Sequence, residues 1–444
     1  MKITLKKGLN LPLAGAVPAG AAPTEVKTAV VAICPEDFPG FVPKTAVAVG
    51  DSVLRGSALL YHKTNTEVKL ISPAAGTVRA VVRGERRRIL RVEVEVSGTD
   101  ALKFENAASG DAFRKLLANS GLLAMMRKRP YDIVPDVNEK VRDIFVTALR
   151  TAPLELPVEA PNPATAARAA KAVAALASLT EGKVYISHSA SAVWPAIAGA
   201  EMVAVDGPHP AGNIGVQIAN IKPVNKGENV WTMDWDVLLR IGRLLETGEV
   251  DTSVEVAVAG PEVAAPCRLI TLAGAQIAPL LKNRLCDDGR HKRIISGNVL
   301  TGTVVDDSDE SFLRAPYRQI TVIAEGDDVD EFMGWASLSP SKMSTSRSFP
   351  LSFLKKVFRP DARLNGGRRA MIMSGEYDRM MPMDILPEFL IKAILANDIE
   401  RMEELGIYEV APEDFALAEF ADTSKLPLQQ IVRAGLDKLR KELE

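Results

Sequence analysis

Glycines divide residues 44–96 into short runs of β-forming residues, and this pattern constrains the fold more than any other feature of the chain. The run VAVGDSV at 47–53 is followed by a turn at Gly56, by ALLYHK at 58–63 and by EVKLISPAAGTVRAVV at 67–82. Apolar runs separated by glycine are typical of antiparallel strands joined by tight turns. They predict a small barrel-sandwich domain, which we bound at residues 1–100 with an N-terminal extension.

This segment resembles the biotinyl and lipoyl carrier domains, in which a V-G-D-x-V turn precedes a hairpin and S-P-x-A-G-x-V follows it. Those elements stand here at 49–53 and 72–78. The resemblance implies a lysine at the hairpin tip that carries the cofactor, but counting back from Gly76 gives Asn65 at that position. Lys63 and Lys69 flank it outside the family's sequence context, so we predict that neither is modified and that the domain serves as scaffold.

Between residues 101 and 253, β-type runs alternate with helical ones. The strands are predicted at 144–149, 183–189 and 202–207, and an alanine-rich helix at 164–180. This alternation predicts an α/β Rossmann-like domain with a partly parallel sheet. Residues 234–245 have the spacing of an amphipathic helix, with Thr232 as its expected N-cap and Gly248 just past its end.

The run HPAGNIGVQI at 209–218 allows two interpretations. Glycines that open a helix can let backbone N–H groups bind a phosphate. A plain loop-to-helix turn is favoured, because Pro208 and Pro210 stand close upstream. His209 is expected to pack against the core rather than to act as a metal ligand or an acid.

The remaining residues predict two further parts. Residues 254–325 combine short strands with one helix near 277–281, and they resemble the β-grasp module that binds soluble ligands (SLBB-like). Residues 326–444 are predicted to form a helical C-terminal domain. The whole chain is therefore expected to be a multi-domain α+β protein.

Composition excludes several classes of protein. A formal net charge of −2 gives no overall attraction to nucleic acid, so no nucleic-acid partner is expected. Cys34, Cys267 and Cys286 form no C-x-x-C pair and predict neither a disulfide framework nor a metal site. No apolar stretch of about 18 residues is present, so the chain is not expected to span a membrane. Prolines and glycines break the apolar segment at 9–22, which argues against a secretory signal.

Over its whole length the chain resembles the A subunit of the bacterial sodium-translocating NADH:quinone oxidoreductases, a family related to the C subunit of the Rnf complexes. The order of the four parts carries this resemblance. It is most specific in five segments, KKGLNLPLAG at 6–15, SPAAGTV at 72–78, SGLLAMMRKRPYDIVP at 120–135, VDGPHPAGNIG at 205–215 and ISGNVLTG at 295–302.

The resemblance implies a peripheral subunit on the cytoplasmic side of the bacterial inner membrane. The complex oxidises NADH, reduces ubiquinone to ubiquinol and exports Na⁺, with flavins and iron–sulfur centres in other subunits. This chain is expected to contact the membrane-embedded B subunit and to lie near quinone at the quinone-reducing end. It is expected to be a subunit of an enzyme and to have no independent catalytic activity of its own.

Departures from the relatives imply that this chain binds no redox cofactor. The flavin-binding relatives have a glycine-rich phosphate loop where this chain has residues 121–130, and Leu122, Leu123, Met125, Met126 and Arg127 are expected to obstruct it. The Rnf-type relatives carry cysteine motifs near the C-terminus, where Met381, Ala418 and Asp422 stand here. No catalytic, cofactor-binding or metal-binding residue is therefore predicted.

Residues 342–369 contain eight Lys or Arg residues and one acid, Asp361, interleaved with Phe349, Phe353 and Phe358. Such a segment is typical of a surface that contacts anionic lipid or a membrane subunit, although a solvated loop has the same composition. Residues 86–88 and 128–129 are further basic runs that can extend it.

Two other functions remain open from the sequence alone. One is a stand-alone flavin or nucleotide oxidoreductase that uses the α/β domain. The other is a soluble ligand-binding module that uses the β-grasp domain. A visible spectrum of the purified chain tests the first, and copurification from solubilised membranes tests the second.

Overall fold

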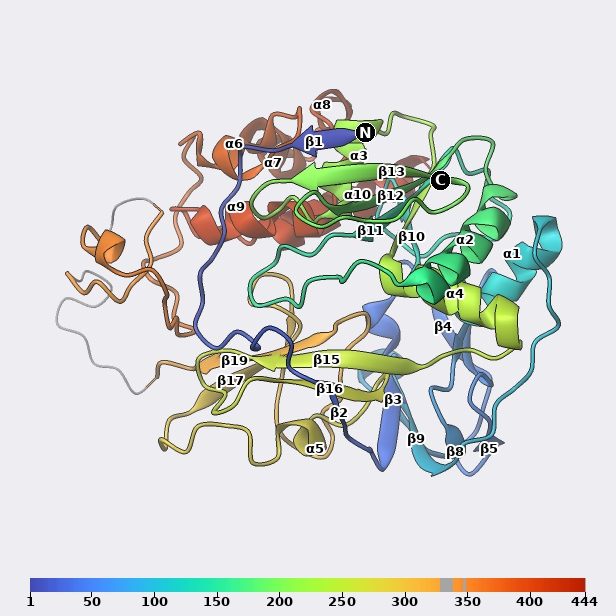
Figure 1. The fold of residues 1–444 in the computed structure, drawn as a ribbon. Helices are drawn as coiled ribbons and strands as arrows, with labels where there is room; N and C mark the ends of the chain where they lie inside the picture. The colour runs from blue at the N-terminus through green and yellow to red at the C-terminus, as the bar shows by residue number, and fades with distance from the viewer. Residues whose placement is uncertain (328–337, 346–348, 444) are drawn as a thin grey trace.

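The computed structural model describes residues 1–327, 338–345 and 349–443. Its strands form four sheets (Figure 1). The sheet of β11–β13 lies in the upper half of the view, the sheet of β15–β19 lies below it, and the small barrel lies at the lower right. Among the described residues, no helix is both long enough and apolar enough to cross a membrane. The predicted multi-domain α+β architecture is confirmed.

The barrel-sandwich consists of two antiparallel sheets, ordered β3-β9-β8-β5 and β4-β6-β7. Its strands are β3 (Val30–Ile33), β4 (Pro43–Thr45), β5 (Ser52–Val53), β6 (Ala58–His62), β7 (Lys69–Ile71), β8 (Ala75–Arg83) and β9 (Ile89–Gly98). A Cβ atom at Gly76 would come 1.9 Å from the Glu95 carbonyl oxygen. Glycine is therefore required there for β8 and β9 to pair closely.

The hairpin of β6 and β7 has Asn65 in its turn, as the spacing predicts. The Nδ1 atom of His62 accepts the backbone N–H groups of Thr64 at 3.3 Å and Asn65 at 3.1 Å. The Asn65 carbonyl accepts the N–H of Val68 at 3.1 Å. These local bonds fix the conformation of the hairpin tip.

The α/β layer has a six-stranded sheet in the order β1-β13-β12-β11-β14-β10, parallel except for β10. Its elements are α1 (Gly110–Asn119), β10 (Arg127–Arg129), β11 (Asp143–Ala148), α2 (Pro163–Ala177), β12 (Val184–Ser189), β13 (Ala200–Asp206), α3 (Ile214–Ile221), β14 (Val230–Asp234) and α4 (Trp235–Thr247). The chain adds β12 and β13 on one side of β11 and then returns to add β14 on the other. Sheets of this kind open a crevice at the carboxyl ends of the strands where the order reverses.

Helix α4 is the amphipathic helix expected from the sequence. Gly248 ends it with a φ of 74°, a conformation that glycine adopts without strain. The expected N-cap was wrong, because Thr232 lies within β14 opposite Phe145 and the strand continues to Asp234. Asp234 is the residue that precedes the helix.

The β-grasp part has a sheet in the order β18-β17-β19-β15-β16-β2. Its elements are β15 (Ser253–Ala259), β16 (Cys267–Leu272), α5 (Ile277–Leu281), β17 (Lys292–Ser296), β18 (Thr303–Val305) and β19 (Gln319–Ala324). Val256, Leu269, Leu280 and Ile320 are fully buried in its core. This packing of one short helix on a mixed sheet agrees with the sequence prediction.

The first 26 residues connect two of these sheets. Strand β1 (Lys2–Thr4) pairs with β13, and β2 (Thr24–Glu25) pairs with β16, both in parallel. Figure 1 shows this segment in blue, running from the upper sheet to the lower one. The division at residues 100, 253 and 325 stays a prediction, because these two strands cross it.

The C-terminal part is helical from residue 376 onward. Its helices are α6 (Glu376–Met380), α7 (Pro387–Ala396), α8 (Ile399–Glu404), α9 (Ala416–Ala421) and α10 (Leu428–Leu443), with the 3₁₀ turns η4 (Ser352–Leu354) and η5 (Pro412–Phe415). Met381, Ala418 and Asp422, which stand where the Rnf-type relatives have cluster ligands, are all buried. The Asp422 carboxylate accepts the backbone N–H groups of Ser424 at 3.0 Å and Leu426 at 2.7 Å, so it shapes the turn after α9.

Candidate functional site

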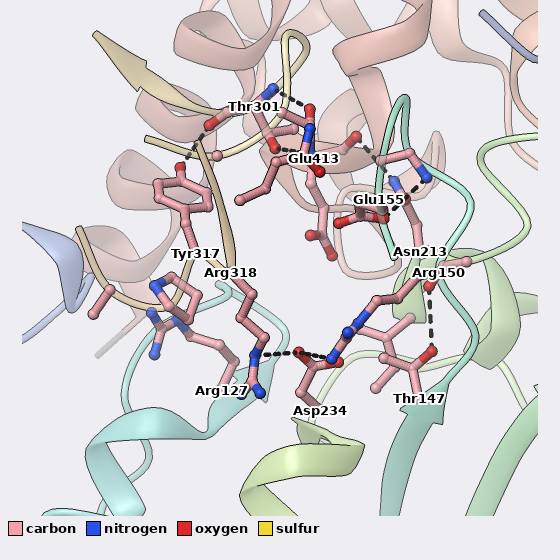
Figure 2. A pocket seen from close by; sticks show the side chains of 18 of the residues that line it. Arg127, Thr147, Arg150, Glu155, Asn213, Asp234, Thr301, Tyr317, Arg318 and Glu413 are labelled. Carbon is pink, nitrogen blue, oxygen red and sulfur yellow. Dashed lines mark hydrogen bonds and ion pairs between the residues drawn. The ribbon is translucent and has the colours of Figure 1, made fainter. Parts of the chain in front are cut away.

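A cavity of about 740 Å³ lies where the strand order of the α/β sheet reverses. Its volume falls within the range of small-molecule sites, about 300–1,000 Å³. All four parts of the chain contribute to its walls, and Figure 2 shows side chains from the α/β layer, the β-grasp part and the C-terminal part converging. We call it the central cavity; its walls include Asp37 and Pro39 from the barrel-sandwich, Thr147, Asn213 and Asp234 from the α/β layer, Asn298, Tyr317 and Arg318 from the β-grasp part, and Glu413, Gln429 and Arg433 from the C-terminal part.

The parallel sheet explains why the α/β residues meet at this cavity. Thr147 lies near the end of β11, Asp234 is the last residue of β14, and Asn213 directly precedes α3. The carboxyl ends of parallel strands lie at one edge of the sheet. Residues far apart in the sequence are thereby brought to one wall.

Two arginines and two aspartates join the α/β layer to the β-grasp part. Arg150 and Arg318 both form ion pairs with Asp236, and their Nη2 and Nε atoms lie 4.0 and 3.8 Å from Asp234 Oδ2. Burial alone would raise the pKa of Asp236, but Arg318 and Arg150 outweigh burial and hold it below its ordinary value. Figure 2 shows Arg150, Arg318 and Asp234 on the cavity wall.

Arg127 is a cation of the cavity wall held by carbonyl groups. It donates to the carbonyl oxygens of Ala124 and Met126 at 3.0 Å and of Asp37 at 2.9 Å. Within the described part of the chain, no carboxylate lies within ion-pair distance of it. Burial lowers the pKa of Arg127 below its ordinary value, although the guanidinium stays charged. It can donate to a ligand that presents an oxygen acceptor.

A buried cluster around Arg129 joins the α/β layer to the C-terminal part. The Arg129 side chain lies 3.0 Å from Glu413 Oε1, 3.3 Å from Asp414 Oδ2 and 3.7 Å from Asp132 Oδ1. Burial and the neighbouring Asp414 raise the pKa of Glu413 above its ordinary value, against the opposing effect of Arg129. The Glu413 side chain is 44% accessible, and it lines the central cavity. It can therefore hold a proton and exchange it with a molecule there.

The N-terminus of α3 was the candidate phosphate site. A Cβ atom at Gly215 would lie 2.4 Å from Asp414 Oδ2, so the chain's own carboxylate packs closely against the first turn of α3. Gly215 is required for this approach of the C-terminal part. The structure agrees with the plain loop-to-helix turn.

His209 is 4% exposed and lines the cavity, with its Nδ1 atom 3.2 Å from Thr151 Oγ1. Burial lowers the pKa of His209 to about 4, so the imidazole is neutral at physiological pH. This placement agrees with the expected packing role. Among the described residues, no group of three or more His, Cys, Asp or Glu side chains is arranged to hold a metal ion.

The side chains expected to obstruct a phosphate loop at residues 121–130 are divided between the core and the central cavity. Leu122, Leu123 and Met126 are buried in the core and do not project into the cavity. Only Met125 and Arg127 of the residues named there line it. The segment packs in the core, and the groups that it presents to the cavity are the Met125 thioether and the Arg127 guanidinium.

Several residues of the basic segment at 342–369 are buried or already paired within the chain. Phe349 and Phe358 are buried, whereas Phe353 is 76% exposed. Arg359 donates to the Pro261 carbonyl oxygen and lies 3.4 Å from Glu262, and Arg347 lies outside the described residues. The run at 128–129 does not extend the surface, because Arg129 is buried and Lys128 pairs with Glu139 at 2.5 Å.

Sequence reasoning named no residue of the central cavity as a site residue. Asp234 and Asp236 stand at the start of a predicted helix, which is a weak local signal. Their arginine partners lie at 150 and 318, and strand order is needed to bring them together.

Comparison with known proteins assigns three of the four parts. Residues 3–97 match the NqrA N-terminal barrel-sandwich hybrid domain, residues 108–250 match the NqrA second alpha/beta domain, and residues 255–307 match the NQRA C-terminal domain. The central cavity draws residues from all three matched regions.

Relatives match over their full length. The A subunit of Na(+)-translocating NADH-quinone reductase from Neisseria meningitidis serogroup B is 36% identical over 454 residues, and that of Pasteurella multocida is 36% identical over 453. The same subunit of Actinobacillus succinogenes is 35% identical over 455 residues. Each alignment covers 99% of this chain and 100% of the relative. The chain therefore belongs to the NqrA family, the A subunits of Na(+)-translocating NADH-quinone reductase.

Proposed function

We propose that this chain is a peripheral subunit of a membrane complex that oxidises NADH, reduces ubiquinone to ubiquinol and exports Na⁺. One observation carries the proposal, the 35–36% identity to NqrA proteins along the full length of these relatives. In this proposal the chain holds no redox cofactor, and flavins and iron–sulfur centres lie in partner subunits. It acts as part of an enzyme and has no catalytic activity alone.

We further propose that the chain docks from the cytoplasmic side onto the membrane-embedded B subunit through its C-terminal part. Exposed apolar side chains are concentrated there: Phe353 is 76% exposed, Phe389 on α7 is 55% exposed and Leu395 is 51% exposed. Large exposed apolar side chains mark interaction surfaces. Lys355 and Lys356 lie beside Phe353 in sequence and are exposed to solvent.

Within the complex, we propose that the quinone ring contacts this chain in the central cavity. The ring presents carbonyl acceptors and apolar faces, and the cavity offers the Arg127 guanidinium beside Met125 and Ile214. Reduction of a quinone to a quinol takes up two electrons and two protons. Partner subunits supply the electrons, and Glu413, whose pKa is raised, holds a proton within the same cavity.

Affinity purification tests the assignment to the complex. A tagged chain is expressed in a strain that lacks its own copy, and membranes are solubilised in mild detergent. Polytopic membrane proteins should copurify, together with NADH:quinone reductase activity that Na⁺ stimulates. Recovery of the folded chain alone, with no loss of that activity in the deletion strain, would contradict the assignment.

Kinetics with two electron acceptors test the quinone contact. Arg127→Met should raise KM for quinone about tenfold or more, because a hydrogen bond from a charged donor is lost. NADH oxidation with a soluble artificial acceptor should stay unchanged, because that reaction bypasses the cavity. Equal loss with both acceptors, or no loss with either, would remove Arg127 from the quinone site.

A further inference from the structure

A second concave site lies in the C-terminal part, and it shares the lining residue Gln429 with the central cavity. It has a volume of about 400 Å³ and is bounded by residues 343–345, by the loop at 363–369 and by α9 with the turn that follows it. Four cations line it, Arg363, Arg368, Arg369 and Lys425, and Glu419 lies beside them on the wall. We call it the cationic groove.

Three of these cations have no carboxylate partner within the described part of the chain. Arg363 pairs with Asp361 at 2.5 Å, and Glu419 accepts the backbone N–H of Gln429 at 2.8 Å. Arg368, Arg369 and Lys425 form no ion pair with any residue that the structure describes. Their backbones are held together, because the N–H of Arg369 donates to the Ser424 carbonyl at 2.9 Å.

Two buried hydroxyl groups are a second indication that the groove binds a ligand. Ser344 and Thr423 are among the lining residues, and their hydroxyl oxygens are inaccessible to solvent and have no hydrogen-bond partner among the described residues. Burying a hydroxyl without a partner is unfavourable. A ligand that carries several oxygen acceptors would complete both bonds once these side chains turn toward the groove.

Apolar side chains line the rest of the groove. Leu364 is 57% exposed and Phe420 is 40% exposed, while Phe349 and Leu426 lie deeper. A free inorganic anion would leave these surfaces uncovered. The lining therefore fits a molecule with a compact anionic head and an apolar remainder.

We propose that the cationic groove binds the headgroup of an anionic phospholipid. The phosphate lies among Arg368, Arg369, Lys425 and the two hydroxyls, and the acyl region contacts Leu364 and Phe420. The choice of a lipid over a soluble phosphate ester rests on the membrane docking proposed above. An acidic peptide fits less well, because the cations and hydroxyls converge on one compact site, which suits the clustered oxygens of a phosphate.

Vesicle binding of the purified full chain tests this proposal. Vesicles of phosphatidylcholine with phosphatidylglycerol are compared with vesicles of phosphatidylcholine alone by sedimentation. The wild-type chain should bind only the anionic vesicles. Glycerol 3-phosphate and poly-glutamate serve as soluble competitors, and neither should displace the vesicles at concentrations matched to the lipid phosphate.

Two variants and one matched control locate the site. Replacing Arg368, Arg369 and Lys425 with Gln should weaken vesicle binding roughly a hundredfold, since each cation near an anionic surface contributes about a factor of five. Thr423→Val, which changes no charge, should weaken it about tenfold through a lost hydrogen bond to a charged group. The control replaces Lys27, Lys103 and Lys282, which are exposed in other parts of the chain, with Gln.

The outcomes separate the possible ligands. Loss in the triple variant and in Thr423→Val, with the control unaffected, supports a phospholipid site. Equal loss in the control, with Thr423→Val unchanged, shows nonspecific attraction and overturns the site. Displacement by glycerol 3-phosphate or by poly-glutamate overturns the lipid in favour of a soluble phosphate or an acidic protein.

Near-ultraviolet circular dichroism confirms that each variant is folded. Absence of vesicle binding with normal copurification of the membrane proteins refutes only this inference. Vesicle binding without copurification refutes only the proposed function.

Discussion

Arginine side chains line both the central cavity and the cationic groove, but their charges have different partners in the two sites. In the central cavity Arg129, Arg150 and Arg318 form ion pairs, and Arg127 lies against backbone carbonyls. In the groove Arg368 and Arg369 form no ion pair among the described residues. Charges inside an enclosed space need partners within the protein, because water cannot solvate them fully. The three ion-paired arginines are therefore part of the folded structure, whereas Arg127 and the groove arginines are available to a ligand.

The largest expected effect is on the free energy of unfolding, and it distinguishes a structural arginine from one that is available to a ligand. Arg129→Met should lower the free energy of unfolding by about 3–5 kcal/mol, because it leaves the buried carboxylate of Asp414 without its cation. Arg368→Met, the matched change in the groove, should lower it by less than about 0.5 kcal/mol. Urea denaturation followed by circular dichroism measures both. Equal unfolding midpoints for the two variants would mean that the cavity charges are no more structural than those of the groove.

Docking is the next effect in size, and the structure restricts which cations to change. Arg359 is unsuitable because it already contacts Glu262. Replacing Lys355 and Lys356 with Glu should weaken association with membranes that carry the partner subunits by about tenfold or more, at about 1 kcal/mol for each cation lost. The control replaces Lys103 and Lys140, exposed in the α/β region, with Glu. If sedimentation and quinone reductase activity match those of the control, the segment around Phe353 is a solvated loop.

A smaller effect concerns pH and tests whether the cavity holds a proton. The pKa of Glu413 is raised in the folded chain, so its neutral form is favoured there. The stability from this protonation is present below the ordinary carboxyl pKa and is lost as pH rises through the folded value. We expect a loss of about 1 kcal/mol or less, because water in the cavity screens the group. Glu413→Gln should remove this part of the pH dependence when urea midpoints are compared from mildly acidic to alkaline pH. An unchanged slope would place the proton elsewhere.

Local patterns were sufficient to predict much of the fold. The glycine-separated runs at 44–96 form the barrel-sandwich, and α4 ends at Gly248 as expected, because strand alternation and helix termini depend on neighbouring residues. The strand positions of Lys2–Thr4 and Thr24–Glu25 were not predictable. Strands of three and two residues have no periodicity, and their pairing partners lie more than about two hundred residues away.

The central cavity escaped prediction for a related reason. Its lining residues span the sequence from Glu36 to Arg433, and the proximity of Arg150 to Arg318 depends on how two sheets meet. The contact between Asp414 and the start of α3 is a further example. No pattern near Gly215 indicates that a carboxylate from the C-terminal part will lie against it. The sequence indicated only part of the cationic groove. Its loop at 363–369 belongs to a run of basic residues, whereas Thr423 and Lys425 join the groove only through folding.

The smallest expected effect concerns the two lysines beside the tip of the β6–β7 hairpin. Lys63 and Lys69 flank the hairpin tip, where local bonds from His62 close the turn around Asn65. A carrier domain presents its lysine at that tip, and here the tip residue has no amine to acylate. We therefore expect intact mass spectrometry of the chain, purified from cells that make biotin and lipoate, to show the unmodified mass. Asn65→Lys is the matched test of the scaffold, and it should change stability by less than about 0.5 kcal/mol. An added biotinyl or lipoyl mass on the wild-type chain would show that an exposed lysine beside the tip is enough for recognition.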